Sequence, residues 1–286
     1  MIRVVRPPQE PPTLAAARAE QLPKLRALVA AQTGPGPRPP EKTLFTSYDV
    51  AKEALRVIVG NKCWCCERPL GKYDPIEHYR PKQRASRGPS MLRDGYWWLA
   101  WTWANLMLLC TECNNVKGTQ FPLRHGCTPL APEEEPPGNE VALLIDPCAV
   151  NPFHHLRFEQ DRSGRWRARP VPGSEIGEKT IEVLGLDGMK KRPGIVDQYH
   201  VHVALAVEPR VDLLKAAIRL GDAKEVFCVW DKTCRALLRK NSPYAALSYH
   251  ALDRRVPPPV RRRWMVTLPE PPWDPLTDPA ACGPTP

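Results

Sequence analysis

The sequence predicts an α+β protein in which a small metal-binding module is embedded in mostly helical surroundings. Two Cys-x-x-Cys motifs, at 63–66 and 110–113, indicate the metal-binding module. Residues 153–170 alternate loosely in hydrophobicity around Ser163 and Gly164, which predicts a β-hairpin. Apolar residues elsewhere recur at helical spacing, so most of the remaining chain is expected to be helical.

Two helices are expected before the first cysteine motif. Residues 13–31 are rich in Ala and Leu and predict one helix. Ser47 is placed to cap a second helix, which runs through residues 49–59. Gly60 then fits a C-terminal stop immediately before the cysteines.

Helices are also expected to dominate the second half of the chain. Residues 174–185 predict a short helix capped by Ser174 and ended by Gly185. A second predicted helix places four apolar residues on one face: Val196, Tyr199, Val203 and Val207. A third keeps helical spacing until Ser242-Pro243 and has an expected core face of Ala223, Val226, Phe227, Trp230, Cys234, Leu237 and Leu238.

The 35 prolines punctuate the chain. Three Pro-rich stretches are expected to be loops or linkers: 34–40, 129–137 and 257–259. The tail from Pro269 onward is expected to be extended or disordered. We therefore divide the chain into an N-terminal helical segment (1–60), a core with the cysteine motifs and the hairpin (61–170), a helical region (171–268) and a tail (269–286).

Composition narrows the possible functions. The net charge is 41 − 31 = +10, which favours a polyanionic partner such as nucleic acid. The sequence has no run of 18 apolar residues and starts without an apolar signal region, so neither a membrane span nor secretion is expected. Ten cysteines without a secretory signal indicate a reducing compartment, so we expect a cytoplasmic protein with metal-binding cysteines.

The paired motifs supply four thiolates, Cys63, Cys66, Cys110 and Cys113, in the pattern of a closed tetrahedral zinc site. The gap of 43 residues between the motifs is longer than in a simple zinc ribbon and leaves room for a functional module. Cys65 is adjacent to a predicted ligand, and we expect it to pack in the core. A structural zinc site is the resulting prediction.

Between and after these motifs lie residues suited to phosphodiester hydrolysis. His78 suits a general base, because a neutral imidazole accepts a proton near pH 7. Glu77 suits a hard cation such as Mg²⁺ or Mn²⁺, and Asn114 offers a second oxygen ligand. The alternative for Asn114 is a helix N-cap, and Asn115 competes for the ligand role. Asn105 is expected to hold the His-bearing loop through backbone hydrogen bonds.

Several other residues have both a functional and a structural interpretation. Arg80 and Lys82 are candidates for phosphate contact or for solvated loop charges. A run of aromatic residues suits either base stacking or, as we favour, packing against the zinc module: Tyr96, Trp97, Trp98, Trp101 and Trp103. An arginine cluster is either a phosphate-binding or partner-binding patch or a solvated charge run: Arg254, Arg255, Arg261, Arg262 and Arg263.

The order Cys-x-x-Cys, Glu-His, Asn-Leu, Cys-x-x-Cys-Asn-x-x-Lys-Gly resembles the HNH endonucleases. The resemblance implies a ββα-metal fold and a metal-dependent endonuclease, with His78 as general base. It also implies Glu77 and Asn114 as metal ligands, Asn105 as the orienting residue and Lys117 as a possible phosphate contact. The chain departs from the usual motif by having Glu77 instead of Asp and Asn114 instead of His, which leaves the preferred metal open.

The motifs CxxCE, IEHYRPK, YWWLAWTWANL and LLIDPC, over about 45–160, further resemble the HNH subunit (PtuB) of Septu anti-phage systems and its retron-associated relatives. This resemblance implies a DNA-cleaving effector that works with a PtuA-like ABC-type ATPase, possibly in an oligomeric complex. An RNA target such as tRNA, or a silent zinc module that binds nucleic acid or a partner, remains an alternative. Asp146 and His155 belong to the same pattern, and their roles stay open.

Overall fold

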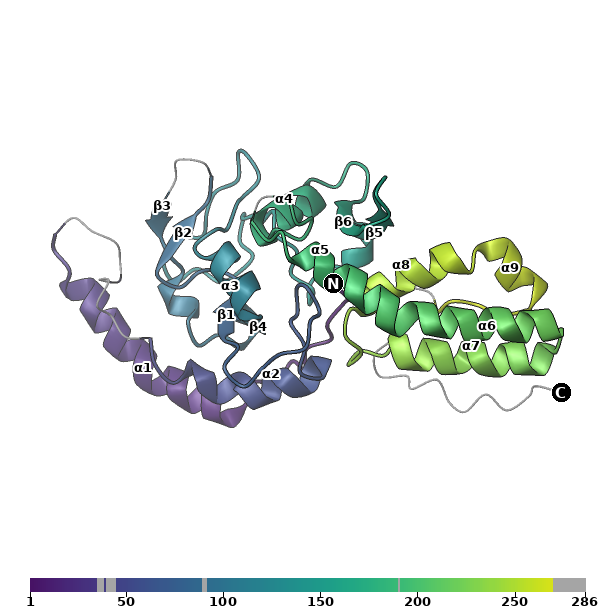
Figure 1. The fold of residues 1–286 in the computed structure, drawn as a ribbon. Coiled ribbons are helices and arrows are strands. Elements are labelled where there is room, and N and C mark those ends of the chain that lie inside the picture. The colour runs from purple at the N-terminus through teal and green to yellow at the C-terminus, as the bar shows by residue number, and fades with distance from the viewer. Residues whose placement is uncertain (35–38, 40–44, 89–91, 190, 270–286) are drawn as a thin grey trace.

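A computed structural model describes residues 1–34, 39, 45–88, 92–189 and 191–269. The short strands and loops, together with the two N-terminal helices, form one half of the molecule, and the C-terminal helices form the other (Figure 1). The N-terminal residues run between these halves, where the amide of Val4 donates to the carbonyl of Pro147 over 2.9 Å. The chain therefore combines helices and strands, as predicted.

Two strands and a helix carry the predicted site residues Glu77, His78 and Asn114. Strand β1 (Ile76–His78) pairs antiparallel with β4 (Leu106–Leu108), with His78 opposite Leu106. Helix α3 (Thr111–Lys117) follows β4 after two residues. The chain between β1 and β4 forms a second antiparallel pair, β2 (Arg84–Ser86) with β3 (Leu92–Asp94).

The aromatic run between β3 and β4 forms core. It includes two 3₁₀ turns, Trp97–Leu99 and Trp103–Asn105. All five aromatic side chains of the run are buried, between 0% and 6% exposed. Packing is thus the correct interpretation of this run, because buried rings offer no platform on which a base could stack.

Helix α1 (Pro12–Ala31) confirms the first predicted helix. A 3₁₀ turn, Tyr48–Ala51, leads into helix α2 (Lys52–Val59), which ends at Gly60 in the left-handed conformation as predicted. The capping role predicted for Ser47 is wrong. Its φ is +66°, far from the extended backbone of a capping residue, and its side chain makes no capping hydrogen bond.

The predicted hairpin and the helix after it are confirmed. Strand β5 (Leu156–Gln160) pairs with β6 (Trp166–Pro170), and a short 3₁₀ turn, Pro152–His154, precedes them. Helix α4 (Glu175–Leu184) begins at Ser174, whose hydroxyl accepts a hydrogen bond from the amide of Gly177. Gly185 ends it with a φ of +61°, as the sequence indicated.

The remaining helices form the extension on the right of Figure 1. They are α5 (Ile195–His202), a π-helical segment (Val203–Val207), α6 (Glu208–Leu220), α7 (Ala223–Leu237), α8 (Ala245–Arg255) and α9 (Pro258–Arg263). Val196, Tyr199, Val203 and Val207 are all buried, which confirms the face predicted for them.

Two sequence expectations fail in this helical region. Ala223 and Phe227 were expected in the core but are exposed. The buried face of α7 is formed by Val226, Trp230, Thr233 and Leu237 instead. The stretch 257–259 was expected to be a loop, yet Pro258 and Pro259 begin α9. Proline is tolerated in the first turn of a helix, where its missing N–H has no intrahelical partner.

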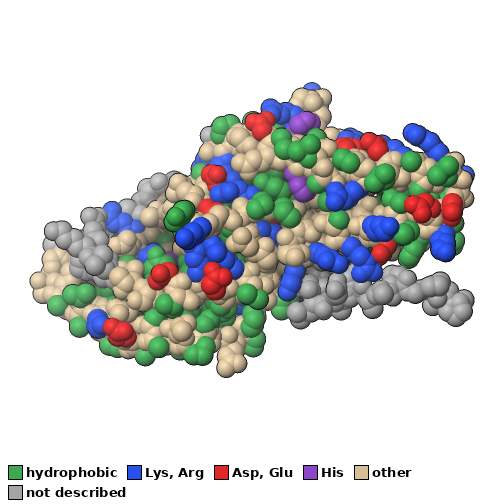
Figure 2. All heavy atoms as spheres, turned by 60° about the horizontal axis from the view of Figure 1, so that its bottom comes forward, with side chains coloured by type: hydrophobic (Ala, Val, Ile, Leu, Met, Phe, Trp, Pro, Cys, Tyr) green, Lys and Arg blue, Asp and Glu red, His purple; other side chains and the backbone are tan. Residues whose placement is uncertain are grey.

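The expected loop at 129–137 forms turns and irregular backbone. Most of the stretch 34–40 and residues 270–286 of the predicted tail lie outside the described residues. In the described ranges, no helix combines the length and apolar character needed to cross a bilayer. On the face shown in Figure 2, Lys and Arg side chains are interspersed with carboxylates, so the net positive charge is not gathered into one uninterrupted patch there.

Candidate functional site

The two Cys-x-x-Cys motifs come together as predicted. The sulfur atoms of the two motifs all lie within 4.8 Å of one another, and the four residues are buried: Cys63, Cys66, Cys110 and Cys113. The sulfurs of Cys66 and Cys110 are 3.6 Å apart. Tetrahedral zinc with Zn–S bonds of about 2.3 Å would hold its sulfurs about 3.8 Å apart, so this donor set fits a structural zinc ion.

Local backbone structure positions the first motif. The amide of Cys63 donates to the carbonyl of Arg68, and the amide of Glu67 donates back to the carbonyl of Cys63, which closes a tight turn. Glu67 adopts a φ of +64° in this turn. The amide of Trp64 donates to the carbonyl of Leu108, so the turn is attached to β4.

The second motif begins helix α3. Cys110 is the N-terminal capping residue, and its sulfur accepts a hydrogen bond from the amide of Cys113 over 3.4 Å. Hydrogen bonds from Cys113 and then Cys63 lower the pKa of Cys110 to about 6. By contrast, burial raises the pKa of Cys65, so that residue stays a neutral thiol and its predicted packing role is consistent with its buried position.

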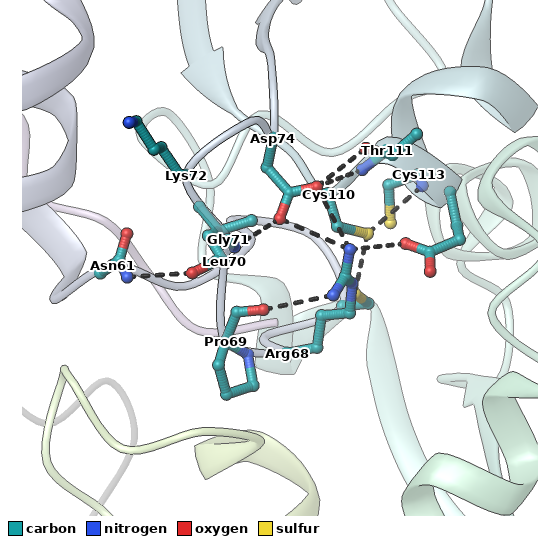
Figure 3. Close-up of polar contacts among 12 residues, drawn as sticks. Asn61, Arg68, Pro69, Leu70, Gly71, Lys72, Asp74, Cys110, Thr111 and Cys113 are labelled. Carbon is teal, nitrogen blue, oxygen red and sulfur yellow. Dashed lines mark hydrogen bonds and ion pairs between the residues drawn. The ribbon is translucent and has the colours of Figure 1, made fainter.

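Asp74 connects the loop after the first motif to the start of the second (Figure 3). Its Oδ1 accepts hydrogen bonds from both the amide and the hydroxyl of Thr111, and its Oδ2 accepts from the amide of Gly71. Arg68 donates to the same carboxylate over 3.2 Å and also contacts Cys110 and Glu112. These contacts fix the distance between the two pairs of cysteines.

His78, the predicted base, is buried at the end of β1. Its Nε2 lies 2.9 Å from the carbonyl oxygen of Ala100, which only accepts, so Nε2 carries the proton and Nδ1 carries the lone pair. The ring of Tyr48 packs edge-on against the imidazole, with 4.8 Å between ring centroids. Burial, followed by the positive charge of Lys82, holds the pKa of His78 well below its ordinary value.

Glu77 and Asn114 are the predicted ligands of a catalytic cation. Glu77 contributes a carboxylate that is 14% exposed, and Lys117 of α3 donates to its Oε1 over 2.6 Å. Asn114 lies within α3 and is half-buried, so the alternative that it caps a helix is wrong: Cys110 has that position. Asn115 is exposed.

Both predicted ligands present oxygen, which is the donor type that Mg²⁺ and Mn²⁺ prefer. Across the described residues, the four cysteines are the one group of three or more His, Cys, Asp or Glu side chains close enough to share a metal. Glu77 and Asn114 are not part of such a group in these residues. A cation bound by Glu77 would have to compete with Lys117 for the carboxylate.

Asn105 lies next to the strand that carries His78. Its side-chain oxygen accepts from the amide of Arg80, and its side-chain nitrogen donates to the carbonyls of Arg80 and Leu99. The amide of Tyr79 donates in turn to the carbonyl of Asn105. This is the geometry expected of a residue that orients the loop after the base.

The three predicted nucleic-acid contacts differ in their surroundings. Arg80 donates to Glu140 over 2.8 Å and Lys117 is buried against Glu77, so contact with phosphate would require these ion pairs to open. Lys82 lies 3.4 Å from Nδ1 of His78 and over the ring of Tyr48. Lys82 is therefore the cation placed beside the base.

The other candidates make local structural contacts. Asp146 accepts from the amide of Cys148, and Nδ1 of His155 lies 2.8 Å from the hydroxyl of Ser174. Three side chains of the arginine cluster make intramolecular contacts. Arg254 donates a hydrogen bond to Gln160, and Arg255 and Arg261 form ion pairs with Glu208 and Asp253.

Three residues that contact the cysteine cluster or its surroundings were not singled out from the sequence. Arg68 and Asp74 contact the residues of the second cysteine motif, as described above. Arg192 donates to the sulfur of Cys113 over 3.0 Å and to that of Cys66 over 3.9 Å. No spacing rule marks them, because their partners lie up to 126 residues away.

Comparison with known proteins gives one informative match. No family model matches the chain, and no solved structure matches it. Septu protein PtuB from Bacillus mycoides (strain KBAB4) is 34% identical over 149 residues, which is 50% of this chain and 49% of the relative. The chain thus matches about half the length of that relative. This match confirms the resemblance found from the sequence: over that half, the chain is a relative of Septu protein PtuB.

Proposed function

We propose that the chain is a metal-dependent endonuclease of the HNH type that hydrolyses phosphodiester bonds in DNA. The observation that carries the proposal is His78, whose Nε2 proton is held by the carbonyl of Ala100, so that the lone pair lies on Nδ1, 3.4 Å from Nζ of Lys82. It follows Glu77 directly on β1, and Lys117 of α3 donates to both Glu77 and the carbonyl of His78. A fixed, neutral imidazole next to a carboxylate is what activation of water near a cation requires.

In this proposal, Lys82 turns from Nδ1 of His78 to the phosphate, and Nδ1 then takes the proton from the attacking water. Asn105 holds the loop after the base, and Lys82 lies where a phosphate oxygen could approach it. Glu77 and Asn114 would hold Mg²⁺ or Mn²⁺, which stabilises the charge on the departing oxygen when bound. Base assistance of this kind contributes about 10²–10⁴-fold to the rate.

The relative suggests the biological setting. Because the match is to a Septu protein, we propose that the chain is the nuclease effector of a Septu-type anti-phage system. A PtuA-like ABC-type ATPase would then be its partner in an oligomeric complex. The buried cysteine cluster would hold a structural zinc that maintains the scaffold around the base.

The test is cleavage of supercoiled plasmid and of total tRNA with Mg²⁺ or Mn²⁺, with and without the ATPase. His78→Gln is the informative variant, because its amide can still donate to the carbonyl of Ala100 but cannot act as a base. His125→Ala, at an exposed histidine, is the matched control. We expect plasmid nicking by the wild type and the control, and at least a 100-fold loss in His78→Gln.

The other outcomes separate the alternatives. Loss of tRNA, dependent on His78, with intact plasmid would move the substrate to RNA. Equal activity of the wild type and His78→Gln, or no cleavage of either nucleic acid by folded protein with its partner, would overturn the nuclease proposal in favour of a silent zinc module.

A further inference from the structure

A buried arginine lies against the sulfur cluster from outside the cysteine motifs. Arg192 is 6% exposed and belongs to the turn between α4 and α5. Its Nη1 donates to the sulfur of Cys113 over 3.0 Å, and its Nη2 donates to that of Cys66 over 3.9 Å. The guanidinium therefore reaches one cysteine from each motif.

The backbone is shaped to bring Arg192 to this position. Gly185 ends α4 with a φ of +61°, which residues with a Cβ rarely adopt. A Cβ at Gly185 would also lie 2.9 Å from Cβ of Lys191 and 3.3 Å from Cγ of Arg192. The chain thus turns back tightly here, and the turn delivers the guanidinium to the cysteines.

Opposite charges explain why Arg192 is buried against the cysteine sulfurs. A guanidinium stays protonated in proteins, and burying it is costly unless an anion compensates the charge. Four thiolates around Zn²⁺ carry a formal charge of 2 − 4 = −2. Arg192 on Cys113 and Cys66, together with Arg68 on Cys110, balances that charge.

A second set of contacts joins the first motif to the C-terminal helices. Lys62 and Glu67 form a buried ion pair at 3.0 Å, and Lys62 also donates to the carbonyl of Ser242. The amide of Ala246, at the start of α8, donates to the carboxylate of Glu67. The amide of Tyr244 donates to the carbonyl of Glu67.

Aromatic packing closes the junction from the side of α5. The ring of Tyr199 packs edge-on against that of Tyr244, with 5.9 Å between centroids. The start of α8 therefore contacts the turn that presents Cys63 and Cys66, and α5 is joined to it through Tyr199 and Tyr244. The same turn is attached to β4 through Trp64, so it contacts both halves of the molecule.

We infer that the metal-loaded cysteine cluster is the joint between the strand-bearing half and the C-terminal helices, and that Arg192 is the positioning residue that couples them. When the metal leaves, thiolates of the cluster take up protons, so the negative charge that Arg192 faces is reduced and the anchor of α5 and of the start of α8 is weakened. This inference concerns the structural metal and holds whether or not the chain cleaves nucleic acid.

The first test is the visible spectrum of the protein with Co²⁺ in the cysteine site. A hydrogen-bonded cation lowers the energy of the sulfur lone pairs, so its removal shifts the sulfur-to-cobalt charge-transfer band to longer wavelength. We expect that shift in Arg192→Met and a band closer to that of the wild type in Arg192→Lys, which retains the charge. Arg219→Met, at an exposed arginine of α6, is the control and should leave the band unchanged.

The same variants are loaded with zinc, and metal release to a coloured chelator is followed. We expect release on the order of 10-fold faster in Arg192→Met, because outer contacts to metal ligands typically contribute 10- to 100-fold to affinity. Band position and release rate equal to those of Arg219→Met would overturn the inference.

A third measurement does not depend on the folding of any variant. Hydrogen exchange of the wild-type protein is compared before and after zinc removal. We expect loss of protection in Ile195–His202 and at the start of Ala245–Arg255, with protection retained in the α6–α7 pair. Unchanged exchange in α5, or an equal loss in all these helices, would overturn the role of the metal as a joint.

Discussion

Nζ of Lys82 lies 3.4 Å from Nδ1 of His78, on the opposite side of the imidazole from the hydrogen bond to Ala100. Burial is the larger reason why the pKa of His78 lies well below 6.5, and the charge of Lys82 adds to it. The base in the proposed reaction is therefore neutral throughout the physiological pH range. A phosphate beside Lys82 would also be beside the atom that accepts the proton.

The first prediction is a pH profile. Since His78 must be neutral to act as a base, kcat/KM for cleavage should fall on the acid side only well below pH 6.5. In Lys82→Gln the pKa of His78 rises, so the acid limb should move to higher pH. Lys24→Gln, at an exposed lysine of α1, should leave it in place.

The same pKa shift affects stability with a definite sign. His78 binds a proton more readily in the unfolded chain, so its contribution to stability is complete above about pH 6.5 and is lost as the pH falls further.

Two results for the pH profile of kcat/KM would contradict the assignment of His78. One is an acid limb that stays unchanged in Lys82→Gln, and the other is a wild-type acid limb at a higher pH than that of an ordinary imidazole.

The second prediction concerns Asn105. Asn105→Ala removes the partners of the Arg80 amide and of the Arg80 and Leu99 carbonyls. Buried backbone groups left without partners cost about 1–3 kcal/mol each, so we expect the free energy of unfolding to fall by about 2–4 kcal/mol in urea denaturation. Asn115→Ala, at an exposed position, should change it by less than about 0.5 kcal/mol. Equal values for the two variants would contradict the orienting role.

The third prediction concerns Lys117, whose ammonium neutralises Glu77 at 2.6 Å. If Glu77 holds the catalytic cation, the two positive charges compete for one carboxylate. Lys117→Met should therefore lower the Mg²⁺ or Mn²⁺ concentration that gives half-maximal cleavage. Near-ultraviolet circular dichroism of the buried tryptophans checks that the variant folds. A folded variant that needs the same or a higher metal concentration would rule out Glu77 as the ligand.

Features with local causes were predictable from the sequence. The Ser174 cap and the stops at Gly60 and Gly185 follow from residues a few positions away, and each was confirmed. The cysteine pairs were predictable because a tetrahedral site imposes a fixed spacing within each pair. Ser47 failed because its left-handed backbone, which tertiary contacts decide, removes its side chain from the capping position.

Features that depend on distant contacts were not predictable. The sequence marks Arg80 and Lys117 as cations near the base, but their pairing with Glu140 and Glu77 spans 60 and 40 residues. Arg192 lies 79 residues beyond Cys113, in a stretch with no motif. The expectation of a ββα fold came from resemblance alone, because periodicity cannot reveal strands of three residues such as β1 and β4.

The last prediction concerns Asp74, which ties the two cysteine pairs together. Its carboxylate is 6% exposed and accepts hydrogen bonds from Gly71, Thr111 and Arg68. Asp74→Ala leaves two amides and a partly buried guanidinium without this acceptor, so we expect a loss of about 2–4 kcal/mol in the free energy of unfolding. Asp74→Asn, which keeps one acceptor oxygen, should lose less.

The contribution of Asp74 to stability also depends on pH, but for a different reason from that of His78: the fold favours the charged form of Asp74 and the neutral form of His78. Burial acts against ionisation of Asp74, but the hydrogen bonds from Gly71 and Thr111, with Arg68, outweigh it and lower its pKa. The stabilisation is therefore complete above about pH 4 and is lost as the pH falls through the folded-state pKa. Asp49→Asn, at an exposed aspartate before α2, is the control. If Asp74→Ala and Asp49→Asn unfold at the same urea concentration, Asp74 does not hold the cysteine pairs together.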